Sequence, residues 1–255
     1  MYGLISQRAG LMSDMSGGTS IEEMRNALRS ALSDPSVGAV VFDIDSPGGS
    51  TDGVTEFASE IRSLRGGRKP IVGQVNTLAG SAAYWLASQM TEIAVTPSGE
   101  VGSIGVFAVH EDVSKAAELA GVKTTLISAG PFKTEGNEFE PLTDEARTHI
   151  QSQVDQFYAM FLHDVASGRR VSAETVAGSY GEGRTLLAKP ALEAGMVDRI
   201  QTLEATIAGL QHPVASVRKA AAIVSPEPAA IAASMTVDRA WNARIAKQMK
   251  RSFLK

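Results

Sequence analysis

A single hydroxyl group stands near the middle of the stretch NTLAGSAAYWLASQM, residues 76–90, at the start of an apolar run. This residue, Ser81, follows a β-rich segment (70–75) by a short loop and opens a segment with helical character. A strand–turn–helix setting is the one in which α/β enzymes present a nucleophilic serine. Serine is also a preferred residue at the start of a helix, where its hydroxyl caps a backbone N–H group. The sequence around Ser81 is therefore compatible with a nucleophile and with a helix cap.

A nucleophilic serine needs a base, and two residues downstream are candidates. His110 lies 29 residues after Ser81 and would form a serine–histidine arrangement. Lys133 lies 52 residues after Ser81, in the loop sequence SAGPFKTEGNEF. A free lysine has a pKa of about 10.4 and is protonated at neutral pH, so this amine would have to be desolvated to act as a base. Residue types alone leave the choice between the two bases open.

A second candidate for chemistry is the sequence DIDSPGGS, residues 43–50, in which we expect a strand to end at Asp45 and SPGG to follow it. Paired glycines after a parallel strand allow backbone N–H groups to point into one concavity, because no Cβ stands in the way. Gly48 and Gly49 would bind a phosphate or a developing oxyanion in this way. Pro-Gly-Gly is also the composition of an ordinary turn, so the motif is weak by itself.

Short β-rich apolar runs alternate with helical patterns over the first half of the chain. The expected strands are 38–44, 70–75, 92–96, 103–109 and 123–128. The expected helices are 20–33, 53–65, 81–90 and 112–120, followed by a longer amphipathic helix over LTDEARTHIQSQVDQFYAMFLHDVASGR. Strands that alternate with helices predict an α/β fold with a parallel sheet.

Composition excludes several classes of site. The chain has 255 residues and a net charge of −4, which gives no reason to expect a nucleic-acid partner. It contains no cysteine, so disulfides, thiolate metal sites and a cysteine nucleophile are excluded. Its four histidines are spaced too widely for a local zinc motif, and we expect no metal. No apolar run is long enough to span a membrane and the N-terminus lacks the layout of a signal peptide, which favours a cytoplasmic protein.

Charge divides the chain near residue 212. Eight basic and two acidic residues follow residue 211, a net charge of +6, against −10 for the preceding part. The sequence SPEPAA at 225–230 has the composition of a linker. We therefore predict a main domain over residues 1–211 and a linker with a basic helical tail over 212–255. Such a tail is either a solvated helix or a segment that docks on an acidic partner surface.

Three stretches together resemble the signal peptide peptidase A family of serine proteases. These are SPGG after a strand, GSAAYWLA opening a helix, and VGSIGV followed by AGPFK. The resemblance covers about residues 2–200 and follows the family's order of motifs to ALEAGMVDRI. It implies the Clp protease/crotonase-like fold, an α/β fold with a parallel β-sheet and flanking helices, and it makes the main domain a Ser-Lys peptidase domain.

The resemblance also implies a role for each site residue. Ser81 would be the nucleophile and Lys133 the general base of a serine–lysine dyad. Gly48 and Gly49 would form the oxyanion hole through their backbone N–H groups, and Ser103 in VGSIGV would help to orient the lysine. His110 stays an alternative base. Peptide hydrolysis by such a dyad requires no metal ion and no organic cofactor.

The SGGTS segment and the sequence GNEFEPLTDEA are similar to the tailed-phage branch of that family. This similarity implies capsid maturation, in which the protease cleaves scaffold or portal-associated proteins in the host cytoplasm or the phage prohead. We also expect a homo-oligomer, because this fold usually builds rings or domes.

Three other interpretations stay open. The chain could be a soluble protease of the signal peptide peptidase type that degrades membrane-derived or unfolded peptides. It could be a crotonase-type acyl-CoA enzyme, which uses similar glycine N–H groups without a serine–lysine pair. It could also be a non-catalytic assembly module with a vestigial site.

Overall fold

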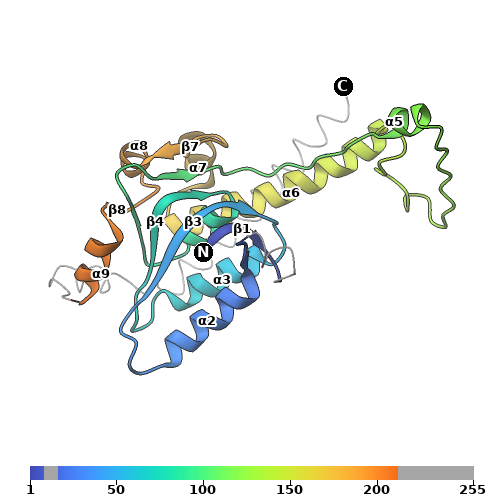
Figure 1. Cartoon of the computed structure of the whole chain (residues 1–255). Helices are drawn as coiled ribbons and strands as arrows, with labels where there is room; N and C mark the ends of the chain where they lie inside the picture. The colour runs from blue at the N-terminus through green and yellow to red at the C-terminus, as the bar shows by residue number, and fades with distance from the viewer. Residues whose placement is uncertain (9–16, 212–255) are drawn as a thin grey trace, which may run out of the picture. The chain divides into compact units, whose positions relative to one another are not determined.

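The computed structural model describes residues 1–8 and 17–211, which form a mainly parallel β-sheet flanked by helices (Figure 1). The strand order is β2-β1-β3-β4-β5-β8, and every pairing along it is parallel. β6 pairs with β4 in parallel and with β7 in the antiparallel direction. The strands are Tyr2–Ser6 (β1), Thr19–Ser20 (β2), Val40–Gly49 (β3), Ile71–Gly80 (β4), Glu92–Val95 (β5), Glu100–Gly102 (β6), Thr185–Leu187 (β7) and Arg199–Ile200 (β8).

Side-chain caps fix the start of the two longest helices. The Ser20 hydroxyl accepts a hydrogen bond from the Glu23 N–H, and the Thr143 hydroxyl accepts one from the Ala146 N–H. Each cap satisfies a backbone donor that has no partner within its helix. The helices are Ile21–Ser33 (α2), Val54–Leu64 (α3), Ala82–Ala87 (α4), Ser114–Leu119 (α5), Asp144–Arg169 (α6), Ala173–Ser179 (α7), Ala188–Glu193 (α8) and Leu203–Gln211 (α9). Within the described ranges, no helix has the length and apolar character needed to cross a membrane.

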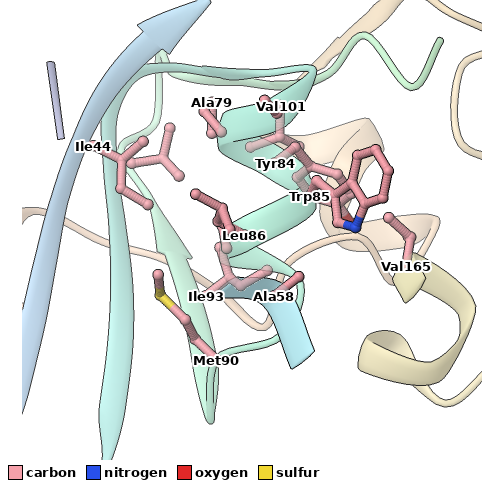
Figure 2. Packing of buried hydrophobic residues seen from close by; sticks show 14 of the residues in the cluster. Ile44, Ala58, Ala79, Tyr84, Trp85, Leu86, Met90, Ile93, Val101 and Val165 are labelled. Carbon is pink, nitrogen blue, oxygen red and sulfur yellow. The ribbon is translucent and has the colours of Figure 1, made fainter. Parts of the chain in front are cut away.

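The core surrounds α4, whose residues are all buried. This short helix packs against β3 and β4 on one side and against α3 and α6 on the other. The Trp85 indole stacks on the Phe161 ring of α6, with ring centroids 4.3 Å apart and planes within 8° of parallel. Figure 2 shows Trp85 pointing toward Val165 of α6, while Leu86 points toward the strands. The position of α4 is therefore set both by the sheet and by the helices α3 and α6.

α6 approaches the C-terminal end of α4 very closely. A Cβ added to Gly168 would lie 2.3 Å from the Ser88 carbonyl oxygen. Only glycine permits two backbones to come so near. This contact and the ring stack join the C-terminal half of α6 to α4.

The expected α/β class, with a parallel sheet and flanking helices, is confirmed. The strands expected at 38–44, 70–75 and 92–96 are present as β3, β4 and β5. The strands expected at 103–109 and 123–128 are wrong, because these segments have no strand partner among the described residues. A β-rich composition describes side chains that suit a pleated surface, and it forms a strand only where a neighbouring strand is available.

The expected turn at SPGG is also wrong. Residues 46–49 continue β3, which pairs with β1 on one side and with β4 on the other. The register with β4 shifts between Ile44 and Ser46, just before Pro47. A bulge is one of the few places where a sheet accepts proline, because proline has no N–H to give to the ladder.

Residues 103–143 connect β6 to α6, and we call residues 107–143 of this connection, which include α5, the arm. The segment from Val106 to Asp112 lines a groove together with Arg147, Ile150 and Val154 of α6. Figure 1 shows α5 and the adjoining loops at the N-terminal end of α6, away from the strands. Every residue from 118 to 133 is exposed. The predicted linker and basic tail, residues 212–255, lie outside the described residues.

Candidate active site

Ser81 connects β4 to α4 with a strained backbone, φ 50° and ψ −123°. L-residues rarely adopt a positive φ, and such a conformation costs on the order of 1–3 kcal/mol. Two hydrogen bonds hold it: the Ser81 N–H donates to the Gly102 carbonyl at 2.8 Å, and the Ser81 carbonyl accepts from the Trp85 N–H at 2.9 Å. The Ser81 side chain makes no capping hydrogen bond. The hydroxyl is therefore presented at an elbow and does not serve as the cap of α4.

Gly48 of β3 lies directly against this elbow. A Cβ on Gly48 would stand 2.7 Å from the Ser81 Cβ and 2.9 Å from the Ala82 nitrogen, and its φ is 102°. Both the space and the backbone conformation therefore require glycine. Gly49 is required for another reason, since its Cβ would stand 2.0 Å from the Ile5 carbonyl oxygen of β1. The first glycine faces Ser81 and the second packs on the neighbouring strand.

Two residues that contact Ser81, Gly48 and Ala82, carry backbone N–H groups near the elbow. The Gly48 N–H donates to Ser46 Oγ over 3.2 Å, and this hydroxyl donates to the Gly3 carbonyl at 2.6 Å. Ala82 begins α4, so its N–H has no acceptor within the helix. We did not predict a role for the Ala82 N–H from the sequence. The signal was available, because the residue after a serine at such an elbow supplies an N–H group to a bound oxyanion.

Ser103 lies next to the elbow from another strand. β4 and β6 pair so that Gly80 stands opposite Gly102, and Ser81 and Ser103 are the residues that follow these two. Ser103 also has a positive φ, 52°, and its N–H donates to the Arg184 carbonyl at 2.9 Å. Two half-buried serines thus leave neighbouring strands side by side.

Both candidate bases lie on the arm. Lys133 is exposed, and a Cβ added to the nearby Gly136 would lie 3.4 Å from the Ile150 side chain of α6. His110 Nε2 lies 2.9 Å from the Asn137 carbonyl oxygen. The arm at these residues thus runs beside the N-terminal half of α6.

Among the described residues, no hydrogen bond joins Ser81 to Lys133 or His110, and the helix that Ser81 opens packs on the C-terminal half of α6. Phe161, the α6 residue that stacks under α4, lies about 16 Å along the helix axis from Ile150. Within one chain the structure thus brings Ser81, Gly48 and Ser103 together and leaves Lys133 and His110 apart from them.

Ser81, Gly48 and Ala82 make an elbow of the kind on which α/β hydrolases carry a nucleophilic serine. Residues 64–217 match peptidase family S49, and the chain belongs to this family. The family predicted from the motifs is therefore confirmed. Within the residues that the structure describes, no group of three or more His, Cys, Asp or Glu side chains is arranged to hold a metal ion.

Relatives include proteins of two phages. The head-tail preconnector protein GP5 of Enterobacteria phage P21 is 36% identical over 198 residues, which cover 78% of this chain and 39% of the relative. The capsid assembly protease C of Escherichia phage lambda is 32% identical over 198 residues, 78% of this chain and 44% of the relative. This chain thus spans less than half the length of either relative.

Among solved structures, a point mutant of the 1510-N membrane-bound stomatin-specific protease is similar with a TM-score of 0.49 and 13% identity. The similarity covers 84% of this chain and 83% of that one.

Proposed function

We propose that this chain is a serine endopeptidase and that Ser81 is its nucleophile. The observation that carries the proposal is the strained elbow at Ser81, packed against Gly48, in a member of a peptidase family. Strain of this kind persists only where the surrounding structure enforces it, and it concentrates at functional sites. A structural serine at the start of α4 would have no need of it.

The oxyanion of the tetrahedral intermediate would be held by backbone N–H groups of Gly48, Gly49 and Ala82. A Cβ added to Gly48 would lie 2.7 Å from the Ser81 Cβ and 2.9 Å from the Ala82 nitrogen, so both residues stand close to Ser81. The Gly48 N–H would give up its long bond to Ser46 Oγ for a charge-assisted bond to the oxyanion, which is the stronger of the two.

We assign the general base to Lys133 of a second copy of the chain. The arm that carries this lysine exposes large apolar side chains, and exposed apolar surface of this kind marks protein interfaces. The exposed apolar side chains of the arm include Phe107 (84% exposed), Leu119 (90%), Ile127 (95%) and Phe132 (59%). A homo-oligomer would cover them and would lay the arm of one subunit over the elbow of the next. Burial of the amine in that contact would favour its neutral form, which a base requires.

The proposed reaction has two steps, acylation and deacylation, and in each of them Lys133 accepts one proton and gives it up again. The neutral Lys133 amine takes the proton of Ser81 Oγ as this oxygen attacks the peptide carbonyl carbon. The carbon–nitrogen bond then breaks, and the ammonium gives its proton to the leaving amine. Water attacks the acyl-enzyme and loses a proton to the same lysine, which returns it to Ser81 Oγ as the acid product leaves. Ser103, beside the elbow, would orient the lysine by a hydrogen bond.

We further propose that the substrates are scaffold or portal-associated proteins of a phage head, cleaved in the host cytoplasm or inside the prohead. Support comes from the two phage relatives, whose names refer to capsid assembly and to the head-tail preconnector.

A fluorophosphonate probe tests the proposed nucleophile. The full chain should be labelled at Ser81 and should cleave an unfolded polypeptide such as casein, and both activities should vanish in Ser81→Ala. Ser63→Ala is the matched control, because this exposed serine on α3 only donates to the Glu60 carbonyl and should leave labelling unchanged. Stoichiometric labelling of Ser81→Ala would refute the assignment.

A further inference from the structure

A buried carboxylate lies beneath the helix that begins at Ser81, and the proposed mechanism does not use it. Asp164 of α6 is 4% exposed. Its Oδ2 accepts a hydrogen bond from the Trp85 indole N–H at 2.9 Å, and its Oδ1 accepts one from Arg62 Nη1 at 3.0 Å. His163 Nδ1 lies 3.7 Å from the same Oδ1. The carboxylate thus joins α4 and α3 to α6.

Trp85 carries this connection to the nucleophile. Its backbone N–H donates to the Ser81 carbonyl at 2.9 Å, while its indole N–H donates to Asp164. Two consecutive hydrogen bonds through one residue therefore link a buried carboxylate to the strained elbow. The stack on Phe161 keeps the indole in the plane that the second bond requires.

A second set of contacts ties the C-terminal end of α4 to the same point. The Gln89 side-chain amide donates to the Asp164 carbonyl at 2.8 Å, and its oxygen accepts from Arg62 at 2.9 Å. α4 is only six residues long and begins with two alanines, so its fixed orientation depends on these anchors.

Stability alone does not explain this arrangement. Replacing a buried ion pair by apolar side chains of similar volume is often neutral or stabilising, because two charges must be desolvated to form the pair. Apolar packing such as the stack on Phe161 sets the plane of the Trp85 ring but not the direction in which its N–H points. A hydrogen bond to a carboxylate fixes it.

We propose that Asp164 is a positioning residue for the nucleophile. By holding the Trp85 indole it fixes α4, and with α4 the Ser81 Oγ and the Ala82 N–H, in the reactive arrangement. This inference rests on the proposed function, in which Ser81 attacks the substrate.

The protonation state of Asp164 agrees with this role. Burial by itself would raise the pKa of this carboxyl, but its interactions with His163, Trp85 and Arg62 outweigh burial and hold the pKa below its ordinary value. The group is therefore a carboxylate at neutral pH and can only accept hydrogen bonds. An asparagine would turn a donor toward either the indole or the guanidinium, and both of these are donors themselves.

The experiment compares the full-length wild type with Asp164→Asn, Trp85→Phe and the double variant. Thermal unfolding first establishes the folded fraction, and kcat, KM and the rate of fluorophosphonate labelling are then measured. Misplacement of a reacting group by about 1 Å costs up to about a hundredfold, so we expect each single variant to lose about tenfold to a hundredfold in kcat with little change in KM. The double variant should lose little more than either single variant, because both remove the same hydrogen bond.

Glu60→Gln is the matched control. This α3 carboxylate pairs with Arg25 at 2.9 Å and with Arg29 at 2.6 Å, and it has no bond to α4. It should lose stability without losing kcat in the folded fraction. If Asp164 only stabilised the fold, Asp164→Asn would likewise lose stability without losing kcat in the folded fraction.

Wild-type kcat in the folded Asp164→Asn protein would overturn the positioning role, and so would losses that multiply in the double variant. If Asp164→Asn does not fold, Trp85→Phe decides, because it keeps the ring on Phe161 and leaves the pair between Asp164 and Arg62 intact; wild-type kcat in this variant would overturn the role. A wild type that the probe does not label at Ser81 would instead refute the proposed function, and the positioning role with it.

Discussion

Around Ser81 every residue of α4 is buried, whereas residues 118–133 of the arm are all exposed. Both regions contain large apolar side chains, but those of α4 are packed within the chain and those of the arm are not. Apolar side chains that a fold leaves outside are available to another molecule. The difference supports the proposal that the elbow with Ser81 is complete within one chain, whereas the arm with Lys133 suits contact with a second copy.

α6 connects the two regions. Its C-terminal half packs on α4 through Phe161 and Gly168, and its N-terminal half lines a groove with the arm through Arg147 and Ile150. The predictions that follow set the nucleophile region against the arm, in order of decreasing effect.

The largest effect is expected from Lys133→Ala. Loss of the general base should lower kcat by about a thousandfold or more, since single members of such catalytic units cost this much. The thermal unfolding midpoint of the subunit should not change, because Lys133 is exposed. Lys123→Ala, an exposed lysine elsewhere on the arm, is the control and should keep full activity.

Mixing Lys133→Ala with Ser81→Ala tests whether the two residues act between subunits. Random mixing in a head-to-tail assembly would restore about a quarter of wild-type activity, since that share of contacts joins an intact serine to an intact lysine. A mixture that stays inactive would contradict the arrangement. Loss of labelling in His110→Ala but not in Lys133→Ala would establish the alternative base.

The next largest loss of kcat is expected from Gly48→Ala. The new Cβ would stand 2.7 Å from the Ser81 Cβ at a φ of 102°, so β3 and α4 would have to separate. We expect kcat to fall by about a hundredfold, as for the loss of an oxyanion-hole donor. Gly66→Ala, where no atom lies within 4 Å of the added Cβ, should leave kinetics unchanged. Wild-type kinetics in Gly48→Ala would remove this glycine from the site.

Trp85→Ala in the nucleophile region should lower the free energy of unfolding, whereas Phe107→Ala in the arm should weaken self-association. Trp85→Ala removes a fully packed ring and should lower the free energy of unfolding by about 3–5 kcal/mol. Phe107→Ala should change it by less than about 0.5 kcal/mol in the isolated subunit, because this ring is 84% exposed. Chemical denaturation gives both values, and analytical ultracentrifugation should show that only the arm variant weakens self-association. Equal destabilisation by both would remove the distinction between the regions.

The smallest effect is a pH dependence of stability. Because the pKa of Asp164 in the folded protein lies below the ordinary value of 3.8, its ionised form stabilises the fold. This contribution is fully present above the unfolded pKa and is lost as the pH falls through the lower folded pKa. The free energy of unfolding should therefore fall more steeply below pH 3.8 in the wild type than in Asp164→Asn. Parallel curves in urea titrations would contradict the shift.

Much of the elbow could be predicted from the sequence because its determinants are local. A serine between a strand and a helix, together with the paired glycines of the strand before that one, defines the setting of Ser81 and Gly48 from the sequence alone. The parallel sheet follows from the alternation of strands and helices. The Ala82 N–H was predictable in the same way, because Ala82 is the residue that follows the serine.

The arm and the Asp164 contacts could not be predicted in this way. Residues 123–128 have the composition of a strand, but whether they form one depends on a partner strand that the described chain does not supply. Asp164 lies in a helix whose apolar spacing says nothing of a buried carboxylate, since its partners Arg62 and Trp85 are far away in sequence. Spacing along the chain also gave no sign that the arm with Lys133 lies beside the N-terminal half of α6, whereas the helix after Ser81 packs on its C-terminal half.

The distance between lysine and serine has a consequence for control under the proposed pairing. A newly made, dilute subunit would carry a nucleophile without its base and would be harmless to the proteins around it. Local crowding with identical copies would then act as the trigger. Proteolysis would begin where, and only where, enough copies have gathered.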